Sequence, residues 1–281
     1  MREIEAGEIV TLVAQLCREA NTRLGQDLMD ALAAANRNEP SPVGRECLER
    51  IRENASLAET EQVPICQDTG MAVVFVDYGQ EVTIRGGELN TAVHEGVRSG
   101  YREGFLRKSV VRDPLIRVNT GDNCPAVIHT RIVPGSRIRI TVAPKGFGSE
   151  NMSRLAMLTP AQGREGVQQF IVETVGLAGA NPCPPVVVGV GLGGSMEMAA
   201  VLAKRALLRR IGSENFDPDL AKFEAELLTS INNLGIGPQG LGGRYTALAV
   251  HLNTYPTHIA GLPVAVNISC HVTRHKTGIL G

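Results

Sequence analysis

The sequence predicts a mixed α/β fold, with a helical N-terminal layer followed by a mixed sheet. Apolar residues recur at helical spacing through about the first 60 positions. After that, short apolar runs bounded by glycine and proline are typical of strands, and helical patterns recur between them. The sequence contains no internal repeat and no low-complexity linker. We therefore predict a single domain over residues 1–281, with the helical part over about 1–60.

The N-terminal layer is predicted from two helical patterns. Residues 5–36 carry apolar side chains at helical spacing and form one helix or two. A second pattern over residues 39–59 begins with Ser41, a good N-cap. Pro42 follows at the first helical position, which tolerates proline because its missing N–H has no intrahelical acceptor there.

Strands and helices alternate in the rest of the chain. Strands are expected at 71–76, 81–84, 244–252 and 263–269, and helices through 89–101, 150–158, 163–178 and 217–233. In residues 125–146, apolar and polar side chains alternate on both sides of Pro134-Gly135, which predicts a β-hairpin. Residues 184–210 combine a buried strand, a glycine turn and a helix. The tail, residues 271–281, is basic and expected to be exposed.

Composition argues against several classes of partner. The 28 basic and 29 acidic residues give a formal net charge of −1, so no global field favours nucleic acid or a membrane surface. Tryptophan is absent, which also disfavours base-stacking modules. Charged residues follow Met1 at once, and no apolar run approaches the roughly 20 residues that span a bilayer. We expect a cytoplasmic protein that binds neither nucleic acid nor a membrane.

Six cysteines are spread along the chain, at positions 17, 47, 66, 124, 183 and 270. None is spaced C-x-x-C, so a zinc ribbon is not indicated, and without a signal peptide a disulfide framework is not expected. Cys17 and Cys47 lie in helical patterns and are interpreted as core filler. The other four lie in loop-like segments, where separated thiolates can converge on one iron–sulfur cluster, although each alone is equally a packing residue.

Other polar or glycine-rich stretches are open to two interpretations. Residues 189–194 (GVGLGG) resemble a dinucleotide fingerprint but lack its final spacing, so a tight strand-to-helix turn is favoured over nucleotide binding. Residues 145–151 (KGFGSEN) could form an anion-binding nest or only a loop. Arg107 suits a carboxylate but lies in a charged run, which is usually a solvated face. His258 is a lone loop histidine, a type that is more often structural.

Residues 63–75 (VPICQDTGMAVVF) place a cysteine, an amide and a carboxylate before a strand. Together with LRKSVV, NTGDNCPAVIH, PKGFGSEN, NPCPPVVVGVGLGG, THIAGLPVAVNISCH and RHK, this stretch resembles the class I fumarase / L-tartrate dehydratase family. The chain is similar to the α subunit of the two-component members along nearly its whole length. The resemblance implies an iron–sulfur hydro-lyase α-type catalytic domain.

The same resemblance implies a cofactor and its ligands. Cys66, Cys183 and Cys270 would hold a 4Fe-4S cluster with one iron not ligated by cysteine. Cys124 is then assigned to packing. An iron with an open coordination position can act as a Lewis acid on substrate oxygens.

Substrate contacts are implied as well. Gln67 and Asp68 would contact a dicarboxylate substrate or its hydroxyl, and Arg107 would hold a carboxylate. Gly148 would donate a backbone amide, and His258 a hydrogen bond, in one interpretation across a subunit interface. Asp68 and His258 are the expected catalytic residues on this chain.

The family's catalytic base, a threonine, belongs to a separate C-terminal domain. We therefore expect a separate β subunit to supply the base, in a dimer of αβ heterodimers, with little activity from this chain alone. The expected reaction is the reversible hydration of fumarate to (S)-malate, with L-tartrate dehydration as the alternative. An iron–sulfur scaffold or sensor and a nucleotide-binding module remain as non-enzyme alternatives.

Overall fold

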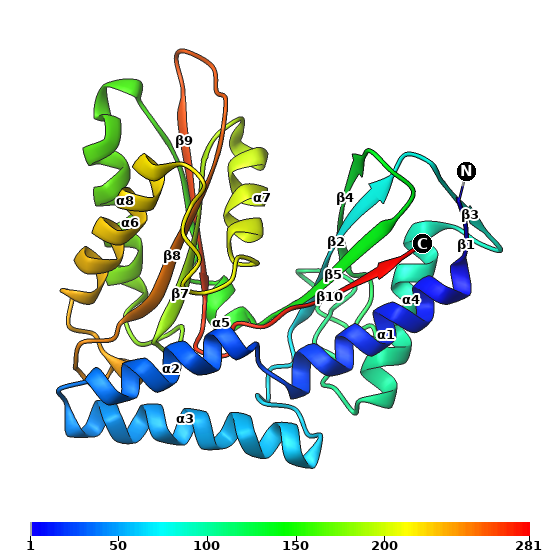
Figure 1. Ribbon diagram of the computed structural model, residues 1–281, viewed down its shortest axis with the longest axis horizontal. Coiled ribbons are helices and arrows are strands. Elements are labelled where there is room, and N and C mark those ends of the chain that lie inside the picture. The colour runs from blue at the N-terminus through cyan, green and yellow to red at the C-terminus, as the bar shows by residue number, and fades with distance from the viewer. Residues whose placement is uncertain (1) are drawn as a thin grey trace. The chain divides into compact units, whose positions relative to one another are not determined.

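The computed structural model describes residues 2–281, which form two compact units. Unit 1 comprises the chain up to Gly25, Asn54–Phe147 and Arg274–Gly281. Unit 2 comprises Gln26–Glu53 and Gly148–Thr273. Helices α and strands β are mixed in each unit, as the sequence predicted (Figure 1). That the whole chain acts as one catalytic domain stays a prediction.

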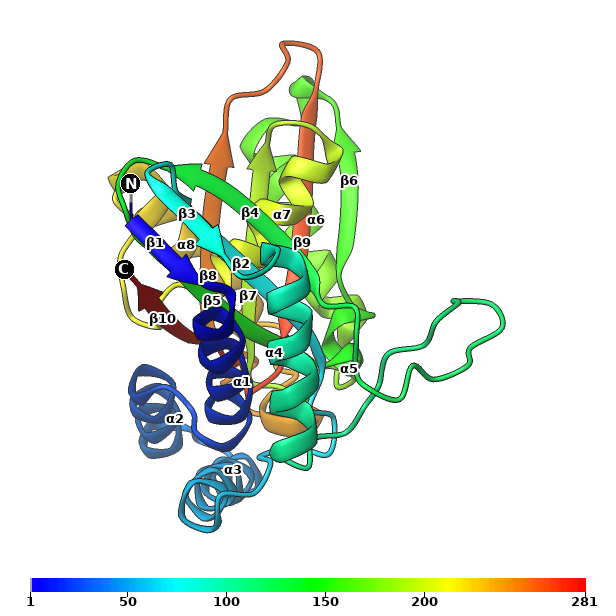
Figure 2. The same ribbon diagram turned by 90° about the vertical axis from the view of Figure 1, so that its right-hand side faces the viewer.

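Unit 1 contains a four-stranded sheet, a small two-stranded sheet and two long helices. Its elements are β1 Arg2–Glu5, α1 Ala6–Thr22, β2 Met71–Gly79, β3 Val82–Arg85, α4 Leu89–Glu103, β4 Val127–Val133, β5 Ile138–Lys145 and β10 Lys276–Leu280. The strand order in the larger sheet is β10-β5-β2-β4, and β1 pairs with β3 in parallel. Figure 2 shows α1 and α4 side by side against this sheet.

Close packing of α1 on α4 forms the core of unit 1. A Cβ at Gly96 would lie 2.6 Å from the Val13 Cβ, and one at Gly100 would lie 2.7 Å from the Ala14 carbonyl oxygen. Because α4 carries glycine at these positions, the two helices approach closely and bury their apolar faces together with β2 and β5. Tyr101, also on α4, is fully buried.

The predicted β-hairpin over residues 125–146 is wrong. Strands β4 and β5 both form, but β2 lies between them, parallel to β4 and antiparallel to β5. The turn at Pro134-Gly135 instead closes over the end of β2, where the N–H groups of Gly79 and Glu81 donate to the carbonyls of Arg137 and Gly135. Alternation along a strand reports which face is buried, and it does not identify the neighbouring strand.

Unit 2 contains a second four-stranded sheet with helices on both faces. Its elements are α2 Gln26–Asn38, β6 Arg154–Leu158, η1 Pro160–Gln162, α6 Gly163–Ala178, β7 Val186–Gly193, α7 Met196–Ala206, α8 Pro218–Asn232, η2 Pro238–Gly240, β8 Ala247–Tyr255 and β9 Leu262–Ser269. Two helices, α3 Pro42–Glu61 and α5 Phe147–Glu150, include the points where the chain passes between units. The strand order is β6-β9-β7-β8. Helices α6 and α8 pack on one face and α7 on the other (Figure 1).

The predicted Ser41 cap forms, and the structure shows a further side-chain cap in α8. The hydroxyl of Ser41 accepts the Gly44 N–H at 3.1 Å, and α3 begins at Pro42. In α8, the carboxylate of Asp217 accepts the N–H groups of Asp219 and Leu220. The N-terminal layer is therefore helical from α1 through α3, as expected.

Two further expectations fail locally. Residues 150–158 do not form a helix, because Arg154–Leu158 is a strand, β6, paired with β9. The tail is not simply exposed either, since β10 pairs with β5 and Arg274 is buried. Gly278 permits this pairing to pack on α1, where a Cβ would lie 2.5 Å from a Leu12 methyl.

The glycines of residues 189–194 serve packing. A Cβ at Gly189 would lie 2.2 Å from the Ala203 carbonyl oxygen, and one at Gly191 would lie 1.9 Å from that of Ala199. Helix α7 therefore rests directly on the backbone of β7. Gly193 and Gly194, both with positive φ, form the tight turn into α7 that the sequence predicted.

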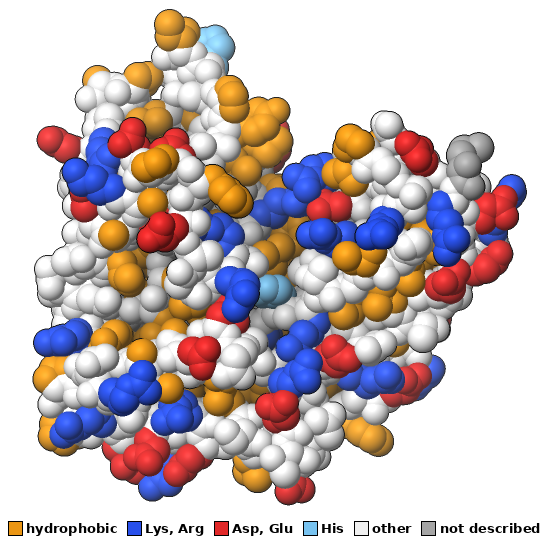
Figure 3. Space-filling view, in the orientation of Figure 1, with side chains coloured by type: hydrophobic (Ala, Val, Ile, Leu, Met, Phe, Trp, Pro, Cys, Tyr) orange, Lys and Arg blue, Asp and Glu red, His pale blue; other side chains and the backbone are white. Residues whose placement is uncertain are grey.

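The surface has no strong single-sign field on the face drawn in Figure 3, where acidic and basic side chains are interspersed over both units. Within residues 2–281, no helix is both long enough and apolar enough to cross a membrane.

Candidate functional site

The loop before β2 holds three of the predicted site residues in unit 1. Cys66 is partly exposed, and its sulfur accepts the Asp68 N–H at 3.4 Å. The thiol donates to the Gln67 Oε1 at 3.4 Å, and the Gln67 side chain is exposed. The loop therefore presents Cys66 as a partly exposed thiol that is hydrogen-bonded to the two residues that follow it in the chain.

Asp68 organises this loop with its carboxylate and its backbone. One carboxylate oxygen accepts the Gly70 N–H at 3.0 Å, and the other accepts the Phe147 N–H at 2.9 Å. Gly146 lets the two segments approach, because a Cβ there would lie 3.2 Å from the Asp68 carboxylate. Both oxygens are thus engaged by the backbone, and only their remaining lone pairs can reach a substrate.

Buried polar groups fix the floor of the loop. The Tyr101 hydroxyl lies 2.9 Å from the carbonyl oxygens of both Thr69 and Gly70. The Asn123 amide donates to the Gly70 carbonyl at 3.2 Å, and its oxygen accepts the Ser109 N–H at 2.7 Å. Burial raises the pKa of Tyr101, so its hydroxyl stays a neutral donor. These contacts hold the backbone of the Cys66 loop against α4.

Arg107 is attached to the same loop through its backbone. Its carbonyl accepts the Thr69 hydroxyl at 3.0 Å, and the Arg107 side chain is exposed. The structure therefore attaches the Arg107 backbone to the loop that carries Gln67 and Asp68, and its role in holding a carboxylate stays a prediction.

Arg274 joins this group from the C-terminal segment of unit 1. Its guanidinium donates to the Asp68 carbonyl at 2.6 Å, and the residue is 7% exposed. Sequence reasoning missed Arg274 as a site residue, because the tail was expected to be exposed. The RHK motif at 274–276 was the available signal.

Cys183 lies at the surface of unit 2 in a turn stiffened by proline. Its φ is +53°, a left-handed value that non-glycine residues rarely adopt, and the Pro184-Pro185 peptide that follows is cis. The residue is exposed. The Pro184 carbonyl accepts the backbone N–H and the side-chain amide of Gln239, both at 2.8 Å. The turn is therefore rigidly held while its thiol faces outward.

Cys270 lies next to this turn, at the end of β9. The residue after it, His271, donates its backbone N–H to the Cys183 carbonyl at 3.4 Å. The His271 Nδ1 lies 2.8 Å from the same carbonyl oxygen and therefore carries the proton. Unit 2 thus brings two of the three proposed cluster ligands together through His271, and Cys270 is partly exposed.

Gly148 lies on the same side of unit 2 as the Cys183 turn. It is exposed, and a Cβ there would lie 3.8 Å from the Asn181 carbonyl oxygen. A side chain would therefore fit at Gly148, and close packing is not the reason for a glycine at this position.

His258 is placed apart from the two cysteines of unit 2. It lies in the loop between β8 and β9, whereas Cys270 follows the far end of β9, a strand of 8 residues that is about 26 Å long. The His258 Nδ1 accepts the Ala260 N–H at 3.1 Å, so the neutral ring carries its proton on Nε2. The residue is exposed beside Ile259, which is 91% exposed. His258 therefore does not share a site with Cys270 of its own chain.

Two of the remaining cysteines, Cys17 and Cys124, differ from the proposed ligands in accessibility. Cys17 is fully buried, and burial raises its thiol pKa. Cys124 is buried and lines a cavity of about 420 Å³. Its thiol donates to the His94 carbonyl at 3.3 Å, and burial raises its pKa to about 11. Cys47 is partly exposed on α3. Both buried cysteines suit packing, and thiolate ligation does not suit them.

All six cysteines are in the thiol form, and Cys66, Cys183 and Cys270 are accessible thiols in rigid turns, which fits iron–sulfur ligation. Among residues 2–281, no three His, Cys, Asp or Glu side chains are grouped closely enough to hold a metal ion. The ligand set therefore rests on the sequence pattern and on the accessibility of these thiols.

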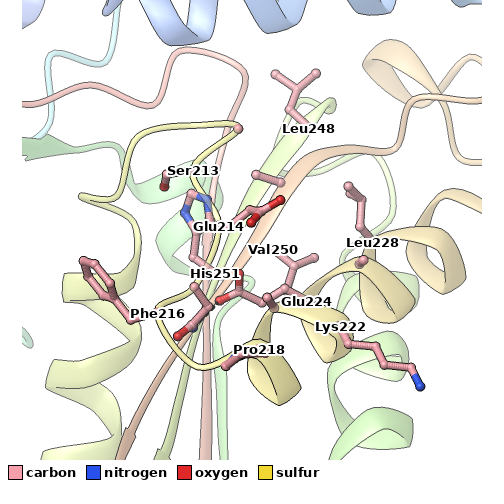
Figure 4. Close-up of a pocket in the computed structure, with 15 residues that line it drawn as sticks. Ser213, Glu214, Phe216, Pro218, Lys222, Glu224, Leu228, Leu248, Val250 and His251 are labelled. Atoms are coloured by element: carbon pink, nitrogen blue, oxygen red, sulfur yellow. Dashed lines mark hydrogen bonds between the residues drawn. The ribbon is translucent and has the colours of Figure 1, made fainter.

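A larger cavity, of about 700 Å³, lies in unit 2 beside β8 and α8 (Figure 4). Its titratable side chains form hydrogen bonds and ion pairs within unit 2. The Glu224 carboxylate accepts the Leu252 N–H at 2.7 Å and pairs with Arg209. The His251 Nδ1 donates to the Ala206 carbonyl at 3.2 Å, and burial lowers the His251 pKa to about 4. We assign this cavity no chemistry.

Fold and loops together define a mixed α/β protein with a polar loop built around an accessible thiol. The family model for fumarate hydratase (Fumerase) matches residues 10–279. The chain belongs to this family. It is 43% identical over 275 residues to a Methanocaldococcus jannaschii protein that carries the provisional name L(+)-tartrate dehydratase subunit alpha, with 95% of each chain covered. It is 34% identical over 274 residues to the L(+)-tartrate dehydratase subunit alpha of Escherichia coli K12, covering 96% of this chain and 90% of that one. The resemblance to α subunits is thereby confirmed.

Proposed function

We propose that this chain is the cluster-bearing α subunit of a hydro-lyase that adds water to fumarate reversibly, giving (S)-malate. The observation that carries the proposal is the loop Cys66-Gln67-Asp68, in which an accessible thiol, an amide and a carboxylate are fixed side by side. Membership of the fumarate hydratase family supports the reaction class.

Cys66, Cys183 and Cys270 are the proposed ligands of a 4Fe-4S cluster. Their accessibility, and the amide aimed at the Cys66 sulfur, support this choice over Cys17 and Cys124. When bound, a cluster iron without a cysteine ligand would supply a Lewis acid for substrate oxygens.

The side chains around the loop would orient the substrate. The exposed Gln67 amide can donate to a carboxylate or hydroxyl oxygen, and Arg107 can form a forked pair with a carboxylate. Asp68, whose two oxygens already accept backbone N–H groups, would accept the substrate hydroxyl with a remaining lone pair. Gly148 would offer its backbone amide.

Removing the carbon-bound proton needs a base, and we propose that it comes from a separate β subunit. The relatives' names, which end in subunit alpha, support a partner chain. His258 would then donate its Nε2 hydrogen to the site of another copy, consistent with a dimer of αβ heterodimers. Its distance from Cys270 along β9 supports a role outside its own chain's site.

L-Tartrate dehydration is the second candidate, favoured by the names of the relatives. The two substrates differ by one hydroxyl, and a pocket built to bind that hydroxyl discriminates strongly. The test is a comparison of kcat/KM for fumarate, (S)-malate and L-tartrate, using the anaerobically reconstituted complex of this chain with its β subunit. A higher kcat/KM for fumarate and malate supports the first proposal. A higher value for L-tartrate selects the second, and activity on none of them contradicts both.

A further inference from the structure

Arg274 is a buried cation without a counter-ion in the structure. It is 7% exposed, and no Asp or Glu forms an ion pair with it within residues 2–281. Its guanidinium makes one hydrogen bond, to the Asp68 carbonyl at 2.6 Å, and its buried Nε has no hydrogen-bond partner. Arginine is rarely this buried unless it is paired.

The surroundings of Arg274 do not supply the missing charge. The Asp68 carboxylate accepts the N–H groups of Gly70 and Phe147 and forms no ion pair with Arg274. The nearby Tyr101 hydroxyl is neutral, because burial raises its pKa.

Taking a charge out of water is costly unless an opposite charge and hydrogen bonds compensate it. We therefore expect the buried Arg274 guanidinium to gain a negatively charged partner when the protein binds a ligand. The loop that Arg274 holds is the one that carries Cys66, so the partner should be an anion bound at this loop.

We propose that Arg274 is the counter-charge for the anion bound at the Cys66 loop and positions that loop through the Asp68 carbonyl. The inference rests on the proposed function, which offers two anions. One is the cluster, whose three thiolates leave it with net negative charge, and the other is a substrate carboxylate. Arg274 is a positioning residue, because it holds the Cys66 loop through the Asp68 carbonyl and offsets the charge of the bound anion.

The test uses the full-length chain as wild type, Arg274→Gln and Arg274→Lys. Arg139→Gln is the matched control, because Arg139 is an exposed arginine on β5 of the same unit. Each protein is studied first without metal, by its melting temperature. In one arm it is then reconstituted anaerobically with iron and sulfide, and the rate of iron release to a chelator and the electron paramagnetic resonance spectrum are recorded. In the other arm the metal-free protein is titrated with succinate, (S)-malate and L-tartrate, and the thermal shift is recorded.

Arg274→Gln should leave the metal-free melting temperature unchanged or raised, because it removes an uncompensated buried charge. If the cluster is the anion, iron release should be faster by about tenfold or more in Arg274→Gln and near wild type in Arg274→Lys. The spectrum should also change in Arg274→Gln. If a carboxylate is the anion, the dicarboxylate thermal shift should be lost in Arg274→Gln and kept in Arg274→Lys. Either pattern supports the inference and identifies the anion.

Two outcomes overturn it. Iron release, spectrum and thermal shifts equal to those of Arg139→Gln would show that no bound anion depends on Arg274. A large loss of metal-free stability that Arg274→Lys does not restore would show a packing role instead. Wild-type protein that takes up no iron contradicts the proposed cluster and not the counter-charge, since the dicarboxylate arm still tests Arg274.

Discussion

Cys66 shows how the local surroundings of the cysteines differ in this protein. Its sulfur accepts an N–H and lies in a partly exposed turn, whereas Cys17 and Cys124 are buried and their thiol pKa values are raised. In the sequence, Cys17 and Cys47 lie in helical patterns and the other four cysteines lie in loop-like segments. Burial separates Cys17 and Cys124 from Cys66, Cys183 and Cys270, and the assignment of these three as cluster ligands stays a prediction.

The cysteines give the first prediction. Changing Cys66, Cys183 or Cys270 to serine should lower the iron content after anaerobic reconstitution by half or more, because serine is a poor ligand for the cluster. Cys124→Ser should retain wild-type iron. Iron and sulfide analysis per chain measures both, with circular dichroism to confirm folding. Wild-type iron in all three variants would contradict the ligand assignment.

His251 gives a prediction for pH dependence. Burial lowers its pKa from 6.5 to about 4 in the folded protein, so the unfolded chain binds a proton there at a higher pH than the folded chain does. The contribution of His251 to the free energy of unfolding is therefore fully present above about pH 6.5. It is lost as the pH falls toward 4, at most by about 1.4 kcal/mol per pH unit.

Urea unfolding from pH 7.5 to pH 4 measures this loss. The His251→Gln variant should be less pH-dependent over the same range, because glutamine does not titrate. An identical slope for wild type and variant would show that His251 does not control this part of the profile.

At the scale of elements, the close packing of α7 on β7 has the clearest consequence. The glycines of 189–194 resembled part of a nucleotide fingerprint, and their structural role is to let backbone meet backbone. An added Cβ at Gly191 would overlap the Ala199 carbonyl oxygen, and neither element can shift without disturbing the sheet.

Gly191→Ala should therefore lower the free energy of unfolding by about 3 kcal/mol. Gly176→Ala is the matched control, because Gly176 is exposed within α6 and a Cβ there meets only the methyl groups of Leu234 at 4.0 Å. That change should raise stability by about 1 kcal/mol, the helix-propensity difference. Urea unfolding measures both. An undisturbed Gly191→Ala would contradict the packing interpretation.

Sequence patterns predicted the existence of most helices and strands. They failed where pairing with a strand remote in sequence determines the local structure. Helices α3, α6 and α8 form close to their expected bounds, since each has its own apolar stripe. Ser41 and Asp217 also cap α3 and α8. Strand β6 was expected to be helical, because five residues do not separate the two periodicities. The hairpin failed because β2, remote in sequence from β5, inserts between β4 and β5.

The candidate site shows the same division. Local sequence identified Cys66, Gln67 and Asp68, which are adjacent in the chain. Sequence could not reveal that Arg274 returns to the Asp68 carbonyl, 206 positions away. Nor could it separate His258 from Cys270, since that depends on the length and direction of β9.

At the scale of the whole molecule, the proposed function requires residues from this chain and from a partner subunit. Cys66 belongs to unit 1, and Cys183 and Cys270 belong to unit 2. The proposed base belongs to another chain. A catalyst built in this way should depend on the cluster and on the partner subunit together.

The most direct test is the rate of fumarate hydration by this chain after anaerobic reconstitution with iron and sulfide, measured with and without the partner subunit. We predict turnover only when iron, sulfide and partner are all present, and loss of that turnover on exposure to oxygen. Full activity from this chain alone, or from the complex without iron, would contradict the account.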